Sequence, residues 1–370
     1  MQMRKSLIVG AILAGFTGTA LAETSVTLYG LIDSGLIYQR AKLGRTDDAG
    51  SSSNQSRFGV QSGQQSGSRW GLRGVEDLGN GISANFVLES GFSTNSGRHD
   101  NNDRLFGRQA TVGLTSALGS LDFGRQTNVA TRFLEGVDPF ALDFYQANAG
   151  STFAAANTVR YDNTVMYTSP YFAGFQFAGG YSFAADETDP AQTSFRTKEN
   201  SRAVTAGLRY VGGPLQVALT YDQQYLKPNQ PRPRQAILGA AYDFEVFKLG
   251  AAYGYSKDGQ ISGPDLPLAA GRSDNAFGGT NGAFTWSGLK VHSYMIGASA
   301  PLGATSAIFG SAQRADPNQN LAPTNIYSLG TTHNLSKRTN LYAYGSYAQN
   351  YAFIKGNTAT TVGAGVRHQF

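Results

Sequence analysis

The side chains that most often carry enzyme chemistry are sparse in this sequence. The 370-residue chain contains no cysteine, which excludes thiolate catalysis, disulfides and thiolate zinc sites. The glycine-rich stretch 278–282 lacks the lysine of a phosphate-binding loop. The histidines have neither metal-ligand spacing nor a serine and an acid that could complete a triad; they are His99, His292, His333 and His368. We therefore expect no enzyme, no cofactor and no metal site.

Charged side chains offer a different chemistry, because several lie on the polar face of alternating segments. Around residues 70–74 the apolar positions are even, which places Arg69 and Arg73 on the opposite face. Glu89 takes the polar parity of the next segment, between Leu88 and Ser90. Fixed charges that line a pore focus ions of one sign. The hypothesis is ion selection, provided that these segments enclose a pore.

Alternation of apolar and polar residues runs through most of the chain and predicts β-strands. It is clearest in residues 26–38, 175–183, 204–210, 215–221, 238–244, 247–255 and 362–370. Each run is close to the roughly 9–11 residues of a tilted membrane-spanning strand. The polar face carries Gly, Ser, Gln and Thr, with few of the Lys and Glu residues that face bulk water. This composition favours a lumen lining over the alternative, a secreted β-sandwich.

Turn signals set the number of strands. Seven short connections are rich in Gly, Pro, Asn, Asp and Ser, at 76–81, 116–120, 169–173, 212–214, 243–245, 300–303 and 335–338. With both termini on the same side, they predict a 16-stranded antiparallel transmembrane β-barrel, wide enough for an aqueous channel. The longer connections fall at about 41–65, 95–104, 127–159, 185–199, 225–233, 257–289, 315–323 and 351–359.

The N-terminal segment predicts export from the cytoplasm. Arg4 and Lys5 precede an apolar stretch over 7–16, and 20–22 is a small-residue cleavage site, so residues 1–22 form a signal peptide. The mature domain is then 23–370, and loss of two basic residues lowers the net charge of +5 to +3. No later segment has 18 consecutive apolar residues. We expect the mature chain in the outer membrane of a Gram-negative cell.

Several motifs resemble the general diffusion porins of Gram-negative outer membranes, most closely the β-proteobacterial branch. They span essentially the whole mature chain: 26–30 (VTLYG), 68–79 (SRWGLRGVEDLG), 105–110 (LFGRQA), 119–126 (GSLDFGRQ), 334–339 (NLSKRT) and the terminal Phe370. The resemblance implies a channel for passive diffusion of small hydrophilic solutes and ions. It also implies a homotrimer in a bilayer with lipopolysaccharide, and no nucleic-acid partner.

The resemblance further implies a constriction where an inward-folded third loop faces basic wall residues. The expected residues are Arg69, Arg73, Arg125 and Arg160, facing Glu89 and the third-loop acids Glu135, Asp138 and Asp143. Arg108 matches a family arginine as well, although alternation with Val112 places it outward. Alternation places Arg160 inward, opposite in parity to Tyr161. The slight excess of positive charge predicts a moderate preference for anions.

Two other functions and one assembly signal also follow from the sequence. A sugar-specific porin would need an aromatic slide, for which Phe140, Phe144 and Tyr145 are candidates. An outer-membrane barrel enzyme is disfavoured, because no catalytic set can be placed in one region. The final segment alternates up to Phe370, which resembles the signal read by the outer-membrane assembly machinery.

Overall fold

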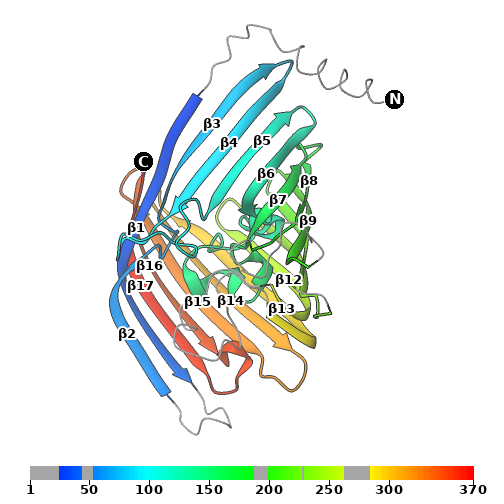
Figure 1. Cartoon of the computed structure of the whole chain (residues 1–370). Helices are drawn as coiled ribbons and strands as arrows, with labels where there is room; N and C mark the ends of the chain where they lie inside the picture. The colour runs from blue at the N-terminus through cyan, green and yellow to red at the C-terminus, as the bar shows by residue number, and fades with distance from the viewer. Residues whose placement is uncertain (1–24, 44–52, 187–198, 227–228, 262–283) are drawn as a thin grey trace.

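The computed structural model describes residues 25–43, 53–186, 199–226, 229–261 and 284–370. The predicted signal peptide, 1–22, lies outside these residues. The described strands form one closed antiparallel sheet (Figure 1). They are β1 (Ser25–Leu43), β2 (Ser53–Ser62), β3 (Arg69–Gly79), β4 (Ile82–Gly91), β5 (Gln109–Ser116), β6 (Gly119–Thr127), β7 (Arg160–Thr168), β8 (Phe175–Ser182), β9 (Arg202–Gly212), β10 (Leu215–Tyr225), β11 (Arg234–Asp243), β12 (Lys248–Gln260), β13 (Phe284–Leu302), β14 (Ser306–Pro317), β15 (Thr324–Asn334), β16 (Thr339–Gln349) and β17 (Thr358–Gln369).

β2 and β3 together make one barrel strand. β2 pairs with the second half of β1 and β3 with its first half, so the barrel has sixteen strands, as predicted. The expected long connection at 41–65 is wrong in part, since β2 lies within it. Residues 63–68 interrupt the strand, beginning at Gly63, whose φ of 65° favours glycine. The seven short turns lie between the strands where the sequence places them.

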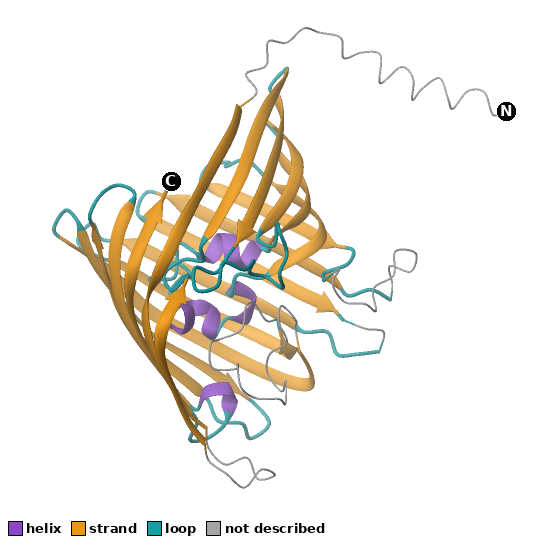
Figure 2. Cartoon of the chain, turned by 60° about the vertical axis from the view of Figure 1, so that its left-hand side comes forward, coloured by secondary structure: helices purple, strands orange, loops and turns teal. Residues whose placement is uncertain are grey.

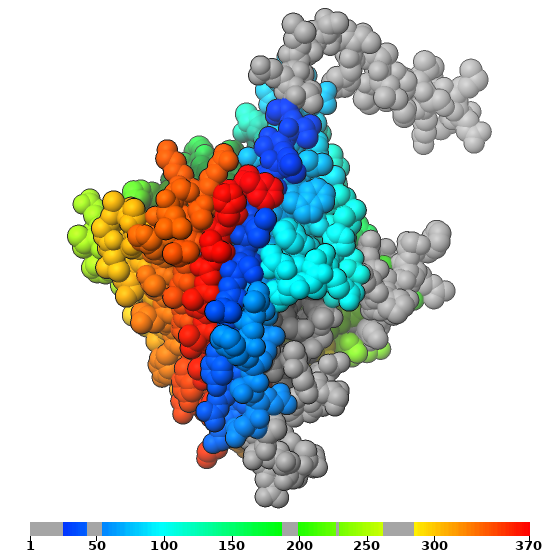
Figure 3. Space-filling view, turned by 90° about the vertical axis from the view of Figure 1, so that its left-hand side faces the viewer, coloured from blue at the N-terminus to red at the C-terminus, as the bar shows by residue number. Residues whose placement is uncertain are grey.

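The barrel closes where the first strand meets the last. β1 pairs with β17 from Leu31–Gln369 to Lys42–Thr358. The backbone N–H of Phe370 donates to Gly30 O at 3.0 Å, and the N–H of Gly30 donates back at 3.1 Å. The start of β1 and the end of β17 therefore lie at the rim with the short turns, and Figure 3 shows β17 in red against β1 in blue. Within the described residues, no helix has the length and hydrophobicity to cross a bilayer.

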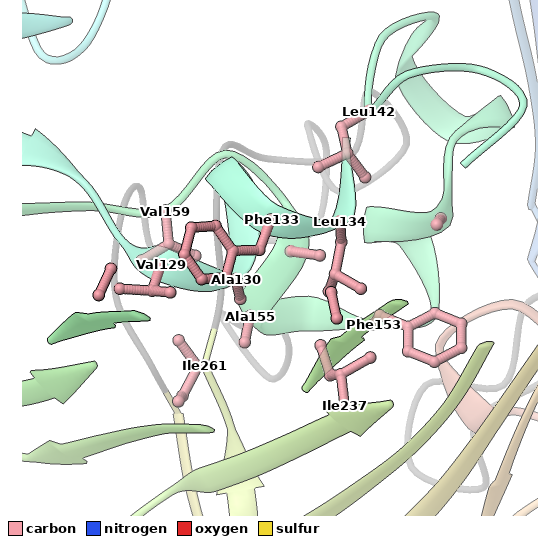
Figure 4. Close-up of a cluster of buried hydrophobic side chains, with 14 of the residues drawn as sticks. Val129, Ala130, Phe133, Leu134, Leu142, Phe153, Ala155, Val159, Ile237 and Ile261 are labelled. Carbon is pink, nitrogen blue, oxygen red and sulfur yellow. The ribbon is translucent and has the colours of Figure 1, made fainter. Parts of the chain in front are cut away.

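The third loop, residues 128–159, folds into the barrel (Figure 2). It carries the short helix α2 (Val129–Leu134) and three 3-10 turns, η1 (Tyr145–Ala147), η2 (Ala149–Ser151) and η3 (Ala154–Ala156). Apolar residues of α2 pack with Phe153 and with Ile237 of the wall (Figure 4). Asn128 caps α2 by accepting from Thr131 N and donates to Asp222 of β10 at 2.9 Å. The interior of this barrel therefore contains its own small hydrophobic core.

Glycines on the inner wall make room for the third loop. A Cβ at Gly250 would lie 2.1 Å from the carbonyl oxygen of Val137, and one at Gly207 would lie 2.8 Å from Val129 Cγ1. The third loop thus lies directly against both strands, with the Val137 backbone at β12 and the Val129 side chain at β9. Because a larger residue at Gly250 would collide with backbone, the wall sequence fixes how deep the loop lies.

Candidate pore constriction

A cavity of about 1150 Å³ lies between the barrel wall and the third loop. Its walls come from the extracellular ends of β3 and β4, the segment 63–68, the second loop (residues 92–108), the third loop and β17. The charged side chains that line it are Arg69, Arg98, Arg108, Arg132, Arg160 and Arg367, with Glu89, Asp100, Asp103, Glu135 and Asp143. Fixed charges of both signs therefore face each other across the space.

Arg108 and Glu89 form a direct ion pair in this cavity. Arg108 Nε lies 2.7 Å from Glu89 Oε1, and the Tyr29 hydroxyl donates to Glu89 Oε2 at 3.0 Å. The outward placement of Arg108 from alternation is wrong, because Arg108 precedes β5 and strand parity does not govern it. Its charge is largely compensated by Glu89.

Arg69 is linked to the third loop through Ser66. Arg69 Nη2 donates to Ser66 Oγ at 2.7 Å, and the side chains of both Arg69 and Ser66 act to lower the pKa of Asp143 in the third loop. Ser66 itself is held by its backbone N–H, which donates to Asp33 Oδ2 at 2.6 Å. Burial raises the pKa of Asp143 to about 7, although the cations of Arg69 and Arg367 oppose this shift. Asp143 therefore titrates near neutral pH.

Arg160 lines the cavity without a direct ion pair in the described part of the chain. Its Nε donates to Arg108 O at 3.0 Å and its Nη1 to Thr158 O at 3.2 Å. The prediction that Tyr161 faces lipid is wrong, since Tyr161 is buried beside α2 with its hydroxyl 3.4 Å from Asp222 Oδ1. The β6–β7 register shifts after Gly124, which interrupts the alternation on which that prediction depended.

Arg125 does not line this cavity; it lies in a neighbouring network of ion pairs. Its Nη1 lies 2.6 Å from Asp162 Oδ1, and its Nε donates to Gly107 O at 2.7 Å. Arg104 of the second loop joins the same Asp162 at 2.7 Å and reaches Asp186 at 2.9 Å. Arg125 sits at the β6 bulge, where the side chain turns toward this network. The network fastens the second loop to β7 and to the segment after β8.

Asp138 is likewise absent from the cavity lining. It is buried and accepts backbone N–H groups of Phe140 at 3.2 Å, Leu142 at 3.0 Å and Ala149 at 3.0 Å. Burial raises its pKa to about 6, against the lowering effect of these bonds. Asp138 thus shapes the third loop; it does not line the charged cavity, but it is among the residues around a second cavity of about 450 Å³.

Arg73 lies outside the cavity on the side of the short turns. It is exposed, with its guanidinium 5.3 Å from the centre of the Tyr29 ring. The inward parity expected for Arg73 agrees with its register opposite Thr27 and Val87. The structure does not bring Arg73 to the cavity, because four residues of strand, roughly 13 Å, separate it from Arg69.

Three lining arginines were missed by the sequence argument: Arg98, Arg132 and Arg367. Arg98 belongs to the second loop, where its Nη2 lies 3.6 Å from Asp103 Oδ2. Arg367 of β17 has inward parity between the outward Val366 and His368, so alternation could have found it. Arg132 belongs to helix α2, where strand alternation does not predict which way a side chain points. Its Nη2 donates to Gln126 Oε1 at 2.7 Å and its Nε to Thr127 Oγ1 at 3.3 Å. Arg132 and Glu135 also line a second cavity of about 450 Å³ on the periplasmic side of the third loop.

The third-loop aromatics do not form an open slide. The Phe140 and Phe144 rings pack against Phe309 at 4.9 and 5.2 Å between centroids, and each is under 5% exposed. Tyr145 reaches the cavity, but its hydroxyl donates to Ser62 O. Phe140 is packed away from the cavity, whereas Phe144 and Tyr145 line it, so these rings anchor the loop to the wall without forming a continuous aromatic slide.

The fold and the charged cavity are those of an outer-membrane porin. The chain matches the Gram-negative porin family over residues 10–352 and belongs to that family. It is 51% identical over 385 residues to an outer membrane porin protein of Bordetella pertussis, with all of both chains covered. It is 33% identical over 368 residues to outer membrane porin protein 32 of Delftia acidovorans, covering 98% of this chain and 92% of that one.

A solved structure agrees with this assignment. The anion-selective porin from Comamonas acidovorans is 28% identical, with a TM-score of 0.71 over 94% of this chain and 100% of that chain. The predicted family branch, the sixteen-stranded barrel and the outer-membrane location are therefore confirmed.

Proposed function

We propose that the barrel is a channel for passive diffusion of small hydrophilic solutes and ions, with a moderate preference for anions and no catalytic step. The observation that carries this proposal is the unequal pairing of charges in the cavity. Six arginines and five carboxylates line the cavity. Beyond the Arg108–Glu89 and Arg98–Asp103 pairs, four arginines (Arg69, Arg132, Arg160, Arg367) remain against three acids (Asp100, Glu135, Asp143) within the described residues. The remaining positive charge attracts anions. The anion selectivity named for the Comamonas porin supports the same proposal.

Local charges, rather than the net charge of the molecule, set this preference. Charges in solvent are screened beyond about 8 Å at physiological ionic strength. The net charge of the mature chain is spread over a whole barrel, so it contributes little at the narrow part of the pore. Only residues that line the cavity act there at close range.

Replacement of Arg69 and Arg160 by glutamine tests the proposal. In a planar bilayer with a tenfold KCl gradient, full selectivity corresponds to about 59 mV. We expect the double variant to shift the reversal potential toward cations by about 10 mV or more, and most strongly at low salt. Conductance should change less, because the barrel width is unchanged. Arg73→Gln is the matched control and should leave the reversal potential near the wild-type value; an unchanged potential in the double variant would contradict the proposal.

The outer surface supports a homotrimer embedded in lipid and lipopolysaccharide. Exposed aromatic residues are dense around β7–β13, at Tyr167, Tyr171, Phe172, Phe175, Phe177, Phe183, Tyr221, Tyr242, Phe244, Phe247, Tyr253 and Tyr294, but sparse elsewhere, at Tyr38, Phe58, Phe123, Tyr327, Tyr347 and Phe370. Aromatic girdles mark lipid contact. The sparse half also carries an apolar groove of about 540 Å³ across β1 and β14–β17. Cross-linking in native membranes should give a trimer.

We also propose cleavage after Ala22. The intact mass of the purified outer-membrane protein should match residues 23–370.

A further inference from the structure

Residues 63–68, which we call the insert, are too many for the gap that they fill in the barrel wall. The pairings Ser62–Ser34 and Arg69–Leu31 flank the insert on either side. Only two residues of β1 lie between these pairings, whereas the opposite strand has six residues there. An ordinary β-bulge adds a single residue. The insert therefore has four residues in excess, which cannot lie in the sheet.

The excess chain folds into the lumen and lines the pore. The residues of the insert that line the cavity of about 1150 Å³ are Gly63, Gln65, Ser66 and Gly67. The other two, Gln64 and Ser68, are buried against the wall. A Cβ at Gly363 of β17 would lie 2.1 Å from Gln64 Oε1, so this glycine leaves the room that the insert occupies. The insert therefore narrows the lumen from the side of β1 and β17.

Asp33 of β1 bonds to the insert with both its backbone and its side chain. Its carbonyl oxygen accepts from Gly63 N at 2.9 Å and from Ser68 Oγ at 3.0 Å, which holds both ends of the insert. Its Oδ2 accepts from Ser66 N at 2.6 Å, which holds the middle. The Tyr342 hydroxyl donates to its Oδ1 at 2.5 Å and so fixes the carboxyl group. Asp33 is therefore the point at which the insert is fastened to the wall.

The insert in turn holds the tip of the third loop. Phe144 N donates to Gln65 O at 3.1 Å, and the Tyr145 hydroxyl donates to Ser62 O just before the insert. Gln65 is itself bonded to the wall, because Asn340 Nδ2 donates to its Oε1 at 2.7 Å. The hydrogen bonds thus run from the wall through the insert to the tip of the loop.

Two arginines of the cavity contact the insert as well. Arg69 Nη2 donates to Ser66 Oγ at 2.7 Å. Gly67 lies against Arg108, because a Cβ at this glycine would be 2.9 Å from Arg108 Nη1. A larger residue at position 67 would push the guanidinium aside. The insert therefore determines where both positive charges lie in the pore.

We propose that the insert is a second constriction element beside the third loop, and that Asp33 is its positioning residue. Asp33 places Ser66, and Ser66 places the guanidinium of Arg69. Asp33 itself is fully buried and does not line the cavity in the described part of the chain, so it acts on ions only through these contacts. The inference rests on the proposed channel function and adds to it an element that sets the width and the charge of the pore.

Deletion of residues 64–67 tests the role of the insert in pore width. The deletion removes the four excess residues and joins Gly63 to Ser68, so the strand pairings on either side keep their register. The barrel should therefore fold, which heat-modifiable gel mobility checks. Single-channel conductance should rise by at least about 1.5-fold, because the lumen widens on the side of β1.

Two variants of Asp33 separate position from charge. Asp33→Ala removes the acceptor of Ser66 N–H, so Arg69 loses its support. In a tenfold KCl gradient the reversal potential should move toward cations by about 10 mV of the ~59 mV for full selectivity. Asp33→Asn is the matched control: it keeps an acceptor oxygen, and the Tyr342 hydroxyl can accept from its amide. This variant should keep the wild-type potential. If Asp33 acted through its charge, both variants would instead move the potential toward anions.

Three outcomes would overturn the proposal. They are wild-type conductance in the deletion variant, a wild-type reversal potential in folded Asp33→Ala, or a shift toward anions in both Asp33 variants. If Asp33→Ala does not fold, the conductance of the deletion variant decides. A wild-type protein that forms no channel would contradict the proposed function. A selective wild-type channel that is insensitive to changes in the insert would contradict only the role of the insert.

Discussion

At the scale of single residues, the charge at the constriction depends on hydrogen-bond partners more than on residue type. Three arginines of family motifs have different partners. Arg69 is hydrogen-bonded to Ser66 and Arg108 is paired with Glu89, whereas Arg125 is paired with Asp162 outside the cavity. An arginine paired with a carboxylate presents little net charge to a passing ion. Among the described residues, Arg160 bonds only to backbone carbonyls, so no paired carboxylate offsets its charge.

Because of Asp143, we expect the ion selectivity of the channel to depend on pH. Its pKa of about 7 is raised by burial, and the groups facing it are Arg69, Arg367, Glu135 and Ser66. Below this pKa the carboxyl group is protonated and neutral, so the cavity has one negative charge fewer. The preference for anions should therefore rise as the pH is lowered from 8 to 6. Above pH 8 the preference should be lowest. Reversal potentials over this range measure the effect.

Asp143→Asn is the variant that checks the assignment. It should have the low-pH selectivity at every pH and lose most of the pH dependence. Persistence of the wild-type pH dependence in this variant would mean that another group titrates.

At the scale of elements, the strands could be predicted, whereas the residues that line the cavity could be predicted only in part. Strand alternation is a local property, so a run such as 215–221 predicts β10 from its own residues, and the turns between strands are equally local. The errors occur where alternation ends: Arg108 lies before a strand, and Arg125 lies at a bulge. Asp138 points into its own loop because three backbone N–H groups of that loop donate to it. The spacing of residues in the sequence does not predict such an arrangement.

Asp138→Ala should loosen the third loop. The substitution leaves three buried N–H groups without an acceptor, at about 1–3 kcal/mol each. The barrel strands do not depend on this carboxylate, so the protein should still fold and insert. We expect higher and noisier single-channel conductance. Asp143→Ala, which removes a carboxylate of the same loop without these three bonds, is the control; a quiet wild-type conductance in Asp138→Ala would contradict the role of Asp138.

At the scale of the whole molecule, the C-terminal residue connects sequence to assembly. The Phe370 ring lies over Gly30, where an added Cβ would come within 2.5 Å of its Cζ, and its backbone pairs with the same glycine. Phe370 is thus part of the seam between the first and last strands.

Deletion of Phe370 should lower insertion into the outer membrane. The change removes the seam's terminal hydrogen bonds and the residue that resembles the assembly signal. Quantitative immunoblotting of outer-membrane fractions, normalised to total expression, measures the effect. Phe370→Tyr should be tolerated. Wild-type levels of the deletion variant would show that Phe370 is dispensable.

The closing seam has a kinetic consequence. Its hydrogen bonds join residues 31–42 to residues 358–369. The first strand therefore cannot form these bonds until the last strand has been synthesised. Contacts with such long sequence separation form slowly. Throughout that interval the chain carries two open strand edges, and open edges pair readily with other chains. To avoid aggregation between synthesis and barrel closure, the chain therefore requires a carrier protein that covers these strand edges until the seam forms.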